Sequence, residues 1–424
     1  MPASTNTLTS NAEDSISNNA ANSWSSEARW LQSLTLLWLA LGLLALASAS
    51  LPVAQASHSD GLYFFKRQLG FATVGLGGMA VITRIEMRHW FKACGVLYVA
   101  ALLLVLATHT GLGVTINGAT RWLQLGMRVQ PSEFLKPLLI LQAGVVFGRW
   151  YTHPTWYRAL WVSLFGIGMG AVLTQPDLGT TAICGMALWL MALVGGVTFR
   201  TLFSTVCLGA STAALSIFVN PYQLARVKAL FLPTAEAQAD NYQVVQSLIA
   251  IGSGGIWGLG FGLSRQKLYY LPIQFTDFIF SVYAEEFGAV GTIGFIILLV
   301  AFTILTLRVA ELCTDLRLRL VAYGCLLLLV GQAAINIGVV SSLLPTTGVT
   351  LPLFSYGGSS VLASIVSAGF LIRVARECRR TKTTSIVRSL HPDRVKLPTL
   401  ADRMRILPGK APHEDTVSEQ RPLS

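Results

Sequence analysis

Charged residues are scarce in this chain, because Asp, Glu, Lys and Arg make up only 12% of its 424 residues, whereas 53% are hydrophobic. This balance excludes a soluble globular protein, which would need a charged surface. Apolar runs such as 34–50 (LTLLWLALGLLALASAS) and 294–305 (GFIILLVAFTIL) interrupt the sequence. An α-helix needs roughly 20 apolar residues to cross a membrane. We therefore predict an all-α polytopic membrane protein.

Cysteines and processing signals are few as well. The six cysteines have no C-x-x-C spacing and none lies in a long loop, which excludes a zinc site or a disulfide framework. The polar N-terminal segment 1–29 has no cleavage site after a short apolar core, so we expect a disordered cytoplasmic tail rather than a signal peptide.

Positive charge is in excess, with a formal net charge of +11. Much of the excess lies in the C-terminal segment 377–424, directly after the last apolar run. A basic tail that follows a span is explained by cytoplasmic placement beside anionic lipid. We therefore expect no nucleic-acid binding.

The apolar runs predict about ten membrane spans. Basic residues lie in alternate loops, and the positive-inside rule places these loops and both termini in the cytoplasm. The other loops then lie outside, including a large one at 220–275 between spans seven and eight. The predicted spans are 31–50, 68–84, 92–109, 132–149, 159–175, 179–197, 201–219, 276–306, 319–343 and 358–375.

Polar segments rich in glycine and proline gather on the predicted outer side, at 113–136, 174–181, 220–278 and 343–360. The predicted cytoplasmic loops are short and basic. We therefore expect the functional site on the outer face of the membrane.

Three acids lie at the start of the eighth predicted span, in QFTDFIFSVYAEEFG. Asp277 stands where the loop meets the span, as a helix N-cap, as a general base for an extracytoplasmic substrate, or as both. Glu285 and Glu286 lie further along, where acids within a membrane face the interior of a bundle and pair. We assign these two to packing or to support of a cavity.

Two further outer segments carry acids. In QPSEFLK, Glu133 and Lys136 are three residues apart, so they share a helical face. They form an intrahelical ion pair, or Glu133 holds Lys136 toward a lipid-linked phosphate. In QPDLGTT, Asp177 lies at a turn between two spans, where it is either a helix cap or a site residue.

Cations in the outer loops run against the usual distribution of positive charge. We therefore predict that Arg121, Arg226 and Lys267 bind an anionic ligand together with Lys136.

The non-helical stretch LPTTGVTLPLFSYGGSS is tolerated at membrane depth only where it is buried in protein or lines a wet cavity. Ser355, Gly357 and Gly358 of this stretch are predicted substrate-binding residues. The stretch has no Walker lysine, which disfavours a nucleotide-binding loop.

Taken together, these segments resemble the SEDS family, the FtsW/RodA/SpoVE-like group of bacterial cell-wall proteins, from about residue 30 to 376. PTTGVTLPLFSYGGSS is similar to the signature segment of the family. Further blocks match in the family's order, namely NGATRWLQLG…QPSEFLK, QPDLGTT, NYQVVQSLIAIGSGG and GFGLSRQKLYYLPIQFTDFIFSVYAEEFG. LPTTGVTLPL looks more like the division-type (FtsW) members, although many of these carry Lys where this chain has Thr347.

The resemblance implies a peptidoglycan glycosyltransferase that polymerises lipid II into β-1,4 glycan strands. It makes Asp277 the essential acid and maps further site residues onto Glu133, Lys136 and Asp177. We expect an inverting displacement with undecaprenyl pyrophosphate as the leaving group, helped by cations or a divalent ion such as Mg or Mn, without an organic cofactor. A lipid II flippase, an elongation-type polymerase and a scaffold for division proteins are the alternatives.

The resemblance also implies partners and a location. Family members act with a class B penicillin-binding transpeptidase and with other division proteins. We expect this chain in the bacterial cytoplasmic membrane at the division septum.

Overall fold

The computed structural model describes residues 25–116, 119–220, 223–224, 226, 238–268, 271 and 274–390 of the chain. Within these residues, helices occupy all ten positions at which spans were predicted. They are α2 (Ser26–His58), α3 (Tyr63–Arg84), α4 (Met87–Ala107), α5 (Pro131–Phe147), α6 (Thr155–Leu173), α7 (Leu178–Val194), α8 (Phe199–Val219), α11 (Ile279–Leu312), the consecutive α12 (Leu316–Leu326), η2 (Leu327–Gly331) and α13 (Gln332–Val340), and α14 (Gly358–Leu390).

Seven helices of the described part of the chain are long and apolar enough to cross a membrane, which confirms a multi-pass helical membrane protein. They are α2, α4, α6, α8, α11, the stretch Leu316–Val340 and the first part of α14. Helices α5 and α7 have only 17 residues each, and α3 is not among the seven. The ten helices are confirmed, while ten crossings and their orientation stay a prediction.

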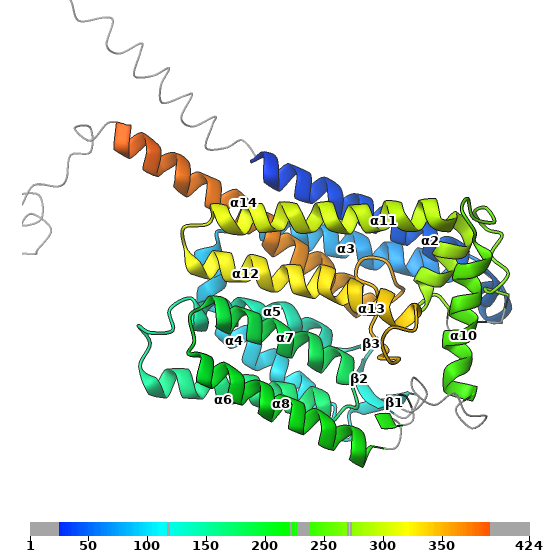
Figure 1. The fold of residues 1–424 in the computed structure, drawn as a ribbon, viewed down its shortest axis with the longest axis horizontal. Coiled ribbons are helices and arrows are strands. Elements are labelled where there is room, and N and C mark those ends of the chain that lie inside the picture. Colours follow the sequence, from blue (N-terminus) through cyan, green and yellow to red (C-terminus); the bar gives the residue numbers. More distant parts are fainter. Residues whose placement is uncertain are drawn as a thin grey trace, which may run out of the picture. The chain divides into compact units, whose positions relative to one another are not determined.

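Four short elements were not predicted. Strands β1 (Gly113–Ile116), β2 (Ala119–Leu125) and β3 (Met127–Val129) form an antiparallel sheet in the order β1-β2-β3. Helix α10 (Gln238–Ser253) lies across the ends of the long helices (Figure 1). The sheet, α10 and the non-helical segment 341–357 share one end of the bundle (Figure 1). This is the end where the sequence places its polar, predicted outer segments.

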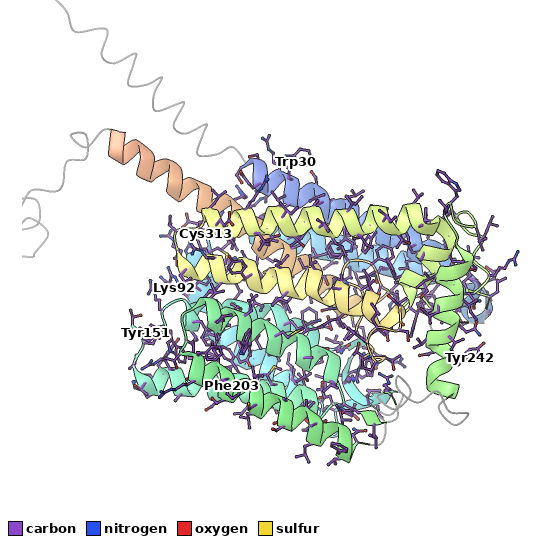
Figure 2. All side chains as sticks on the ribbon, in the orientation of Figure 1. Trp30, Lys92, Tyr151, Phe203, Tyr242 and Cys313 are labelled. Atoms are coloured by element: carbon purple, nitrogen blue, oxygen red, sulfur yellow. A yellow bond between two sulfur atoms is a disulfide. The ribbon has the colours of Figure 1, made fainter. Side chains whose placement is uncertain are left out.

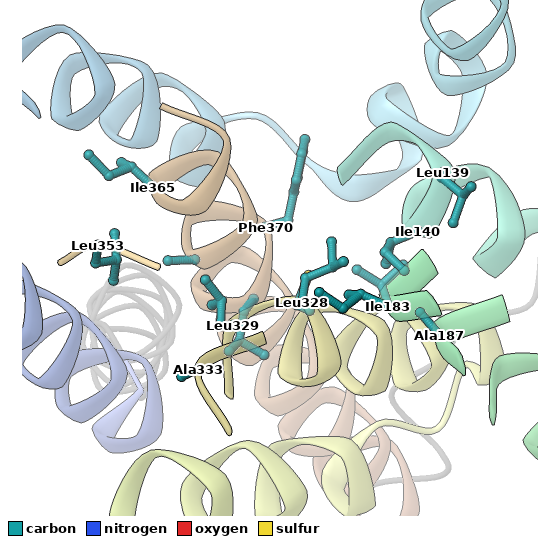
Figure 3. Close-up of a cluster of buried hydrophobic side chains, with 14 of the residues drawn as sticks. Leu139, Ile140, Ile183, Ala187, Leu328, Leu329, Ala333, Leu353, Ile365 and Phe370 are labelled. Atoms are coloured by element: carbon teal, nitrogen blue, oxygen red, sulfur yellow. The ribbon is translucent and has the colours of Figure 1, made fainter. Parts of the chain in front are cut away.

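Apolar side chains from facing helices fill the interior of the bundle (Figure 3). Ile140 of α5, Ile183 of α7, Leu328 of η2 and Phe370 of α14 belong to one buried cluster. The outside of the helices is also apolar, as Figure 2 shows at Phe203 of α8, which is 62% exposed. An apolar exterior around an apolar core is what a bilayer requires, since lipid replaces water around the spans.

Helix α11 is broken at Gly288, whose φ of 64° and ψ of −163° are non-helical. The break is bridged by the glycine-rich turn that follows α10, since the amide of Leu259 donates to the carbonyl of Glu285 (3.0 Å) and Ala289 donates to Gly255 (2.9 Å). These bonds satisfy polar backbone that the broken helix leaves free.

One prediction about cysteines is wrong. Cys313, which ends α11, and Cys378 of α14 form a disulfide with a Cα–Cα distance of 4.7 Å. The pair is 65 residues apart in sequence, so spacing alone gives no signal. It becomes visible only when α11 and α14 lie side by side. Cys94, Cys184, Cys207 and Cys325 are free.

The helices at both ends of the described residues extend into the predicted tails. Helix α2 starts at Ser26, with Ser25 as its N-cap, so it begins within the predicted tail 1–29. Helix α14 continues past residue 377 to Leu390. The chain divides into two units at Arg380, and the second unit holds the last turns of α14. The rest of both predicted tails, 1–24 and 391–424, lies outside the described residues.

The break in α11 gives a stability prediction. A Cβ atom at Gly288 would lie 2.3 Å from the amide nitrogen of Gly258, in a backbone conformation that only glycine adopts readily. We expect Gly288→Ala to lower the free energy of unfolding by about 1–3 kcal/mol through backbone strain alone, with the steric clash adding to this loss. Gly294→Ala in the same helix is the control, since nothing lies within 4 Å of that added methyl group. Thermal unfolding of both variants in detergent checks this, and equal melting temperatures would contradict it.

Candidate functional site

Asp277 lies in the turn that leads into α11, and it is half-buried. The N-cap of α11 is Phe278, and no side chain caps this helix, so the N-cap interpretation of Asp277 is wrong. The turn is held from α13 instead. The Asn336 side-chain amide donates to the backbone carbonyls of Asp277 and of Val349, both at 2.8 Å. The Asp277 carboxylate is therefore left for other partners.

Two arginines and a second aspartate surround the Asp277 carboxylate electrostatically. The pKa of Asp277 is raised to about 6, mainly by burial and to a smaller extent by the negative charge of Asp177, while the positive charges of Arg226 and Arg121 act in the opposite direction. A carboxyl group with this pKa is ionised at neutral pH, and it accepts a proton more readily than an ordinary aspartate.

Arg121 is carried by β2 to the turn between α6 and α7. Its Nε donates to the carbonyl of Gln175 at 3.0 Å and a terminal nitrogen donates to that of Pro176. Its other terminal nitrogen lies 3.7 Å from the Asp177 carboxylate, in a buried ion pair. The unpredicted sheet thus has a clear role, because it delivers a buried cation to the site.

Asp177 is the N-cap of α7, where its carboxylate accepts a hydrogen bond from the amide of Thr180 at 3.1 Å. The cap prediction for this residue is confirmed. Arg226 is held by the non-helical segment 341–357, since its guanidinium donates to the carbonyl of Thr346 at 3.1 Å. Residues from four separate parts of the sequence therefore converge on Asp277.

Glu133 and Lys136 form the predicted ion pair on α5, with 2.9 Å between Nζ and Oε1. Lys136 also donates to the side-chain oxygen of Gln332 at 2.9 Å, and the Gln332 amide donates to the carbonyl of Thr350 at 2.8 Å. The ammonium group is thus committed to two protein acceptors. The second carboxylate oxygen of Glu133 is buried without a hydrogen-bond partner.

Gln332 and Asn336 are the site residues that the sequence reasoning missed. They lie one turn apart on α13 and reach the neighbouring carbonyls of Thr350 and Val349. Gln332 contacts the ion pair of α5, and Asn336 contacts the turn of Asp277. The signal was present, because two amides four residues apart in the apolar run GQAAINIGVV are expensive in a membrane unless they have partners.

Lys267 does not join this group in the described structure. Its ammonium donates to Glu286 at 3.0 Å and to the hydroxyl of Ser48 at 2.8 Å. Glu285 accepts hydrogen bonds from Ser253, Ser264 and the amides of residues 265 and 266. The two glutamates therefore hold the 264–267 loop against α11, in accord with the supporting role predicted for them. We leave Lys267 out of the candidate site.

Ser355, Gly357 and Gly358 lie where the non-helical segment enters α14. Gln68 of α3 donates to the carbonyl of Ser355 at 3.0 Å and accepts from the amide of Gly357 at 3.2 Å. The Ser355 hydroxyl accepts from the amide of Leu351, and Gly358 lies against the ring of Phe71. These contacts fix the backbone of the segment, and the amide of Tyr356 donates to the carbonyl of Phe275, two residues before Asp277. Substrate binding by the three residues stays a prediction.

Comparison with known proteins agrees with this architecture. Residues 28–380 match the model of the FtsW/RodA/SpoVE family, described as a cell cycle protein. A Synechocystis sp. protein named probable peptidoglycan glycosyltransferase FtsW is 48% identical over 84% of this chain and 90% of its own. Stage V sporulation protein E of Bacillus subtilis is 36% identical over 82% of this chain and 96% of its own.

Solved structures give the same grouping. A chain from a study of how a peptidoglycan synthase complex coordinates polymerization and crosslinking superimposes with a TM-score of 0.68. It is 31% identical and covers 84% of this chain and 99% of its own. The rod shape determining protein RodA of Thermus thermophilus gives a TM-score of 0.60 at 30% identity, covering 82% of this chain and 96% of its own.

The raised pKa of Asp277 predicts a pH-dependent stability. Its carboxyl binds a proton more tightly in the folded state, with a pKa of about 6, than an exposed aspartate does, whose pKa is 3.8. The resulting contribution to stability is complete below pH 3.8 and is lost as the pH rises through about 6. We therefore expect the melting temperature of the wild type to fall across this window and that of Asp277→Asn to lack this component. Superimposable profiles of the two proteins would contradict the raised pKa.

The buried pair on α5 predicts non-additive substitutions. Lys136→Met leaves the Glu133 carboxylate buried without a countercharge, so we expect a loss of about 3–5 kcal/mol in the free energy of unfolding. The double variant Lys136→Met/Glu133→Leu removes both charges and should regain most of that loss. Unfolding of the single and double variants in detergent measures this coupling. A double variant as unstable as Lys136→Met would contradict it.

Proposed function

Because the chain belongs to the FtsW/RodA/SpoVE family of cell cycle proteins, we propose that it is a peptidoglycan glycosyltransferase, the activity for which its relatives are named. It joins the disaccharide units of lipid II into β-1,4 glycan strands at the outer face of the membrane. The observation that carries this proposal is the half-buried Asp277 carboxylate, which Arg121 and Arg226 flank at the polar end of the bundle.

Asp277 serves as the general base in this proposal. The 4-hydroxyl group of the acceptor sugar gives its proton to Asp277 while its oxygen attacks the anomeric carbon of the donor. A pKa of about 6 supports this role, because such a carboxylate is ionised at neutral pH yet more basic than usual. General base catalysis of this kind contributes typically about 10²–10⁴-fold in rate.

The leaving group is undecaprenyl pyrophosphate, whose developing charge needs cations and no proton. Arg121 and Arg226 are the cations beside Asp277, whereas Lys136 is held by Glu133 and Gln332 and supports the site. We propose one direct displacement with inversion. A glycosyl-enzyme would need a second carboxylate, and Asp177 is occupied as the cap of α7 and by Arg121.

We propose separately that a divalent cation such as Mg or Mn takes part in the reaction. Among the described residues, no group of three or more His, Cys, Asp and Glu side chains could hold a metal ion. The described part of the chain therefore fits a resident metal poorly, and we assign no reaction step to one. An ion that takes part would enter with the diphosphate of the substrate.

The relatives named FtsW favour a role in septal wall synthesis during division over the elongation-type role. A class B penicillin-binding transpeptidase is the partner that we propose, because a structural relative comes from a complex of polymerization and crosslinking. The outer loop 220–275 and exposed helix faces are its docking surface in this proposal. The location that we propose is the bacterial cytoplasmic membrane at the division septum.

The decisive experiment is polymerisation of lipid II by the purified protein in detergent, with and without the transpeptidase. We expect glycan strands from the wild type and a loss of at least about 10²-fold for Asp277→Asn, which keeps the shape of the side chain and removes its basicity. Asp315→Asn is the matched control, because Asp315 caps the start of α12, while Gln332 and Asn336 lie in α13 at the other end of the stretch Leu316–Val340, and it pairs with Arg317.

The outcomes separate the alternative functions. A wild type that makes no glycan even with its partner, while vesicles show lipid II translocation, would replace the transferase by a flippase. Normal cell division with Asp277→Asn would favour a scaffold instead.

A further inference from the structure

Gly348 lies at the centre of the candidate site, although no substrate-binding role was assigned to it. Its φ is +72°, and a Cβ atom built on its backbone would lie 3.7 Å from the nearer Asp277 carboxylate oxygen. The same point is 3.7 Å from a terminal nitrogen of Arg121 and 3.9 Å from one of Arg226. The absence of a side chain at Gly348 therefore leaves a small space that three charged groups line. We refer to it as the Gly348 space.

The groups around the Gly348 space are held in place by their own contacts. Arg226 donates to the carbonyl of Thr346, and Arg121 donates to those of Gln175 and Pro176. The Asp277 backbone is held by Asn336. A site whose groups are fixed before the substrate arrives has little reorganisation to undergo during the reaction.

The charges around the Gly348 space are close to balance. Arg121 and Arg226 bring two positive charges, while Asp277 and the paired Asp177 bring two negative ones. A phosphate dianion at this point would lie against the Asp277 carboxylate. A neutral hydroxyl group fits better, because it can donate to the carboxylate and accept from a guanidinium.

We propose that Gly348 is a positioning residue, whose missing side chain leaves room for the acceptor sugar hydroxyl between Asp277 and the two arginines. This inference rests on the proposed glycosyltransferase function. In the reaction, the hydroxyl O–H bond breaks and its proton passes to Asp277. The oxygen forms the new bond to the anomeric carbon, and the bond from that carbon to the diphosphate oxygen breaks, with its electron pair leaving on the diphosphate.

A methyl group at Gly348 tests this assignment, because it reduces the Gly348 space without displacing the side chains around it. Contacts of 3.7–3.9 Å are ordinary van der Waals distances, so the side chains of Asp277, Arg121 and Arg226 need not move. The methyl group would still narrow the space between the Gly348 backbone and these side chains, through which the hydroxyl has to come within hydrogen-bond distance of Asp277. Misplacement of a reacting group by about 1 Å costs on the order of 10²-fold in rate.

Backbone strain is the competing explanation, and the chain offers matched controls for it. Gly126 has a φ of +74° and Gly262 a φ of +81°, and nothing lies within 4 Å of a Cβ atom at either position. Alanine at these glycines carries the same left-handed backbone cost as alanine at Gly348. Neither substitution reaches the Gly348 space.

The experiment compares Gly348→Ala with Gly126→Ala and Gly262→Ala in the lipid II polymerisation assay, with thermal unfolding measured in parallel. We expect all three to lose similar thermal stability. Gly348→Ala should lose on the order of 10²-fold in activity, mainly in kcat, because the hydroxyl is misplaced relative to its base. The two controls should stay within about twofold of the wild type, since strain alone leaves the reacting atoms in place.

A further variant separates strain from occupancy. Asparagine tolerates the left-handed conformation better than alanine but has a larger side chain. Gly348→Asn should therefore be more stable than Gly348→Ala and no more active. Equal activity of Gly348→Ala and the two controls, or recovery of activity in Gly348→Asn, would overturn the inference. A wild type that makes no glycan would instead refute the proposed function.

Discussion

The non-helical segment 341–357 has to satisfy its backbone inside a helical bundle, and the site depends on how it does so. Non-helical backbone at membrane depth is stable only where protein or a wet cavity supplies partners. Gln332 and Asn336 of α13 hold the carbonyls of Thr350 and Val349, and Gln68 of α3 holds the entry into α14. The same two amides of α13 also contact Lys136 and the turn of Asp277.

The segment 341–357 also positions the charged groups of the site. The segment presents the carbonyl of Thr346 to Arg226 and the bare backbone of Gly348 to Asp277. The sheet brings Arg121 to the same point from another part of the chain. Burial removes water from the Asp277 carboxylate, and this loss of hydration outweighs the attraction of the two arginines, so the pKa of Asp277 is raised.

The sequence predicted the positions of the helices well, because long apolar runs are a strong signal, although several helices extend beyond the predicted runs, as α2 (Ser26–His58) does beyond 31–50. It also predicted the ion pair of Glu133 and Lys136 and the cap at Asp177, since both depend on residues three apart. Lys267 could not be assigned in this way. Its charge is plain in the sequence, but its partners Ser48 and Glu286 are distant in the chain. Only the structure shows that the ammonium group of Lys267 binds these two residues.

The amino-acid sequence by itself determined the membrane class, the helix positions and, through its motifs, the family, and the family resemblance led to the prediction that Asp277 is the essential acid. These features follow from hydrophobicity and local spacing, which act along the chain. Only the tertiary structure decided which cations face Asp277, that Cys313 meets Cys378, and that Gly348 lies against the charged groups of the site. Such features depend on contacts between segments that are far apart in sequence, and these contacts cannot be predicted from the local sequence pattern.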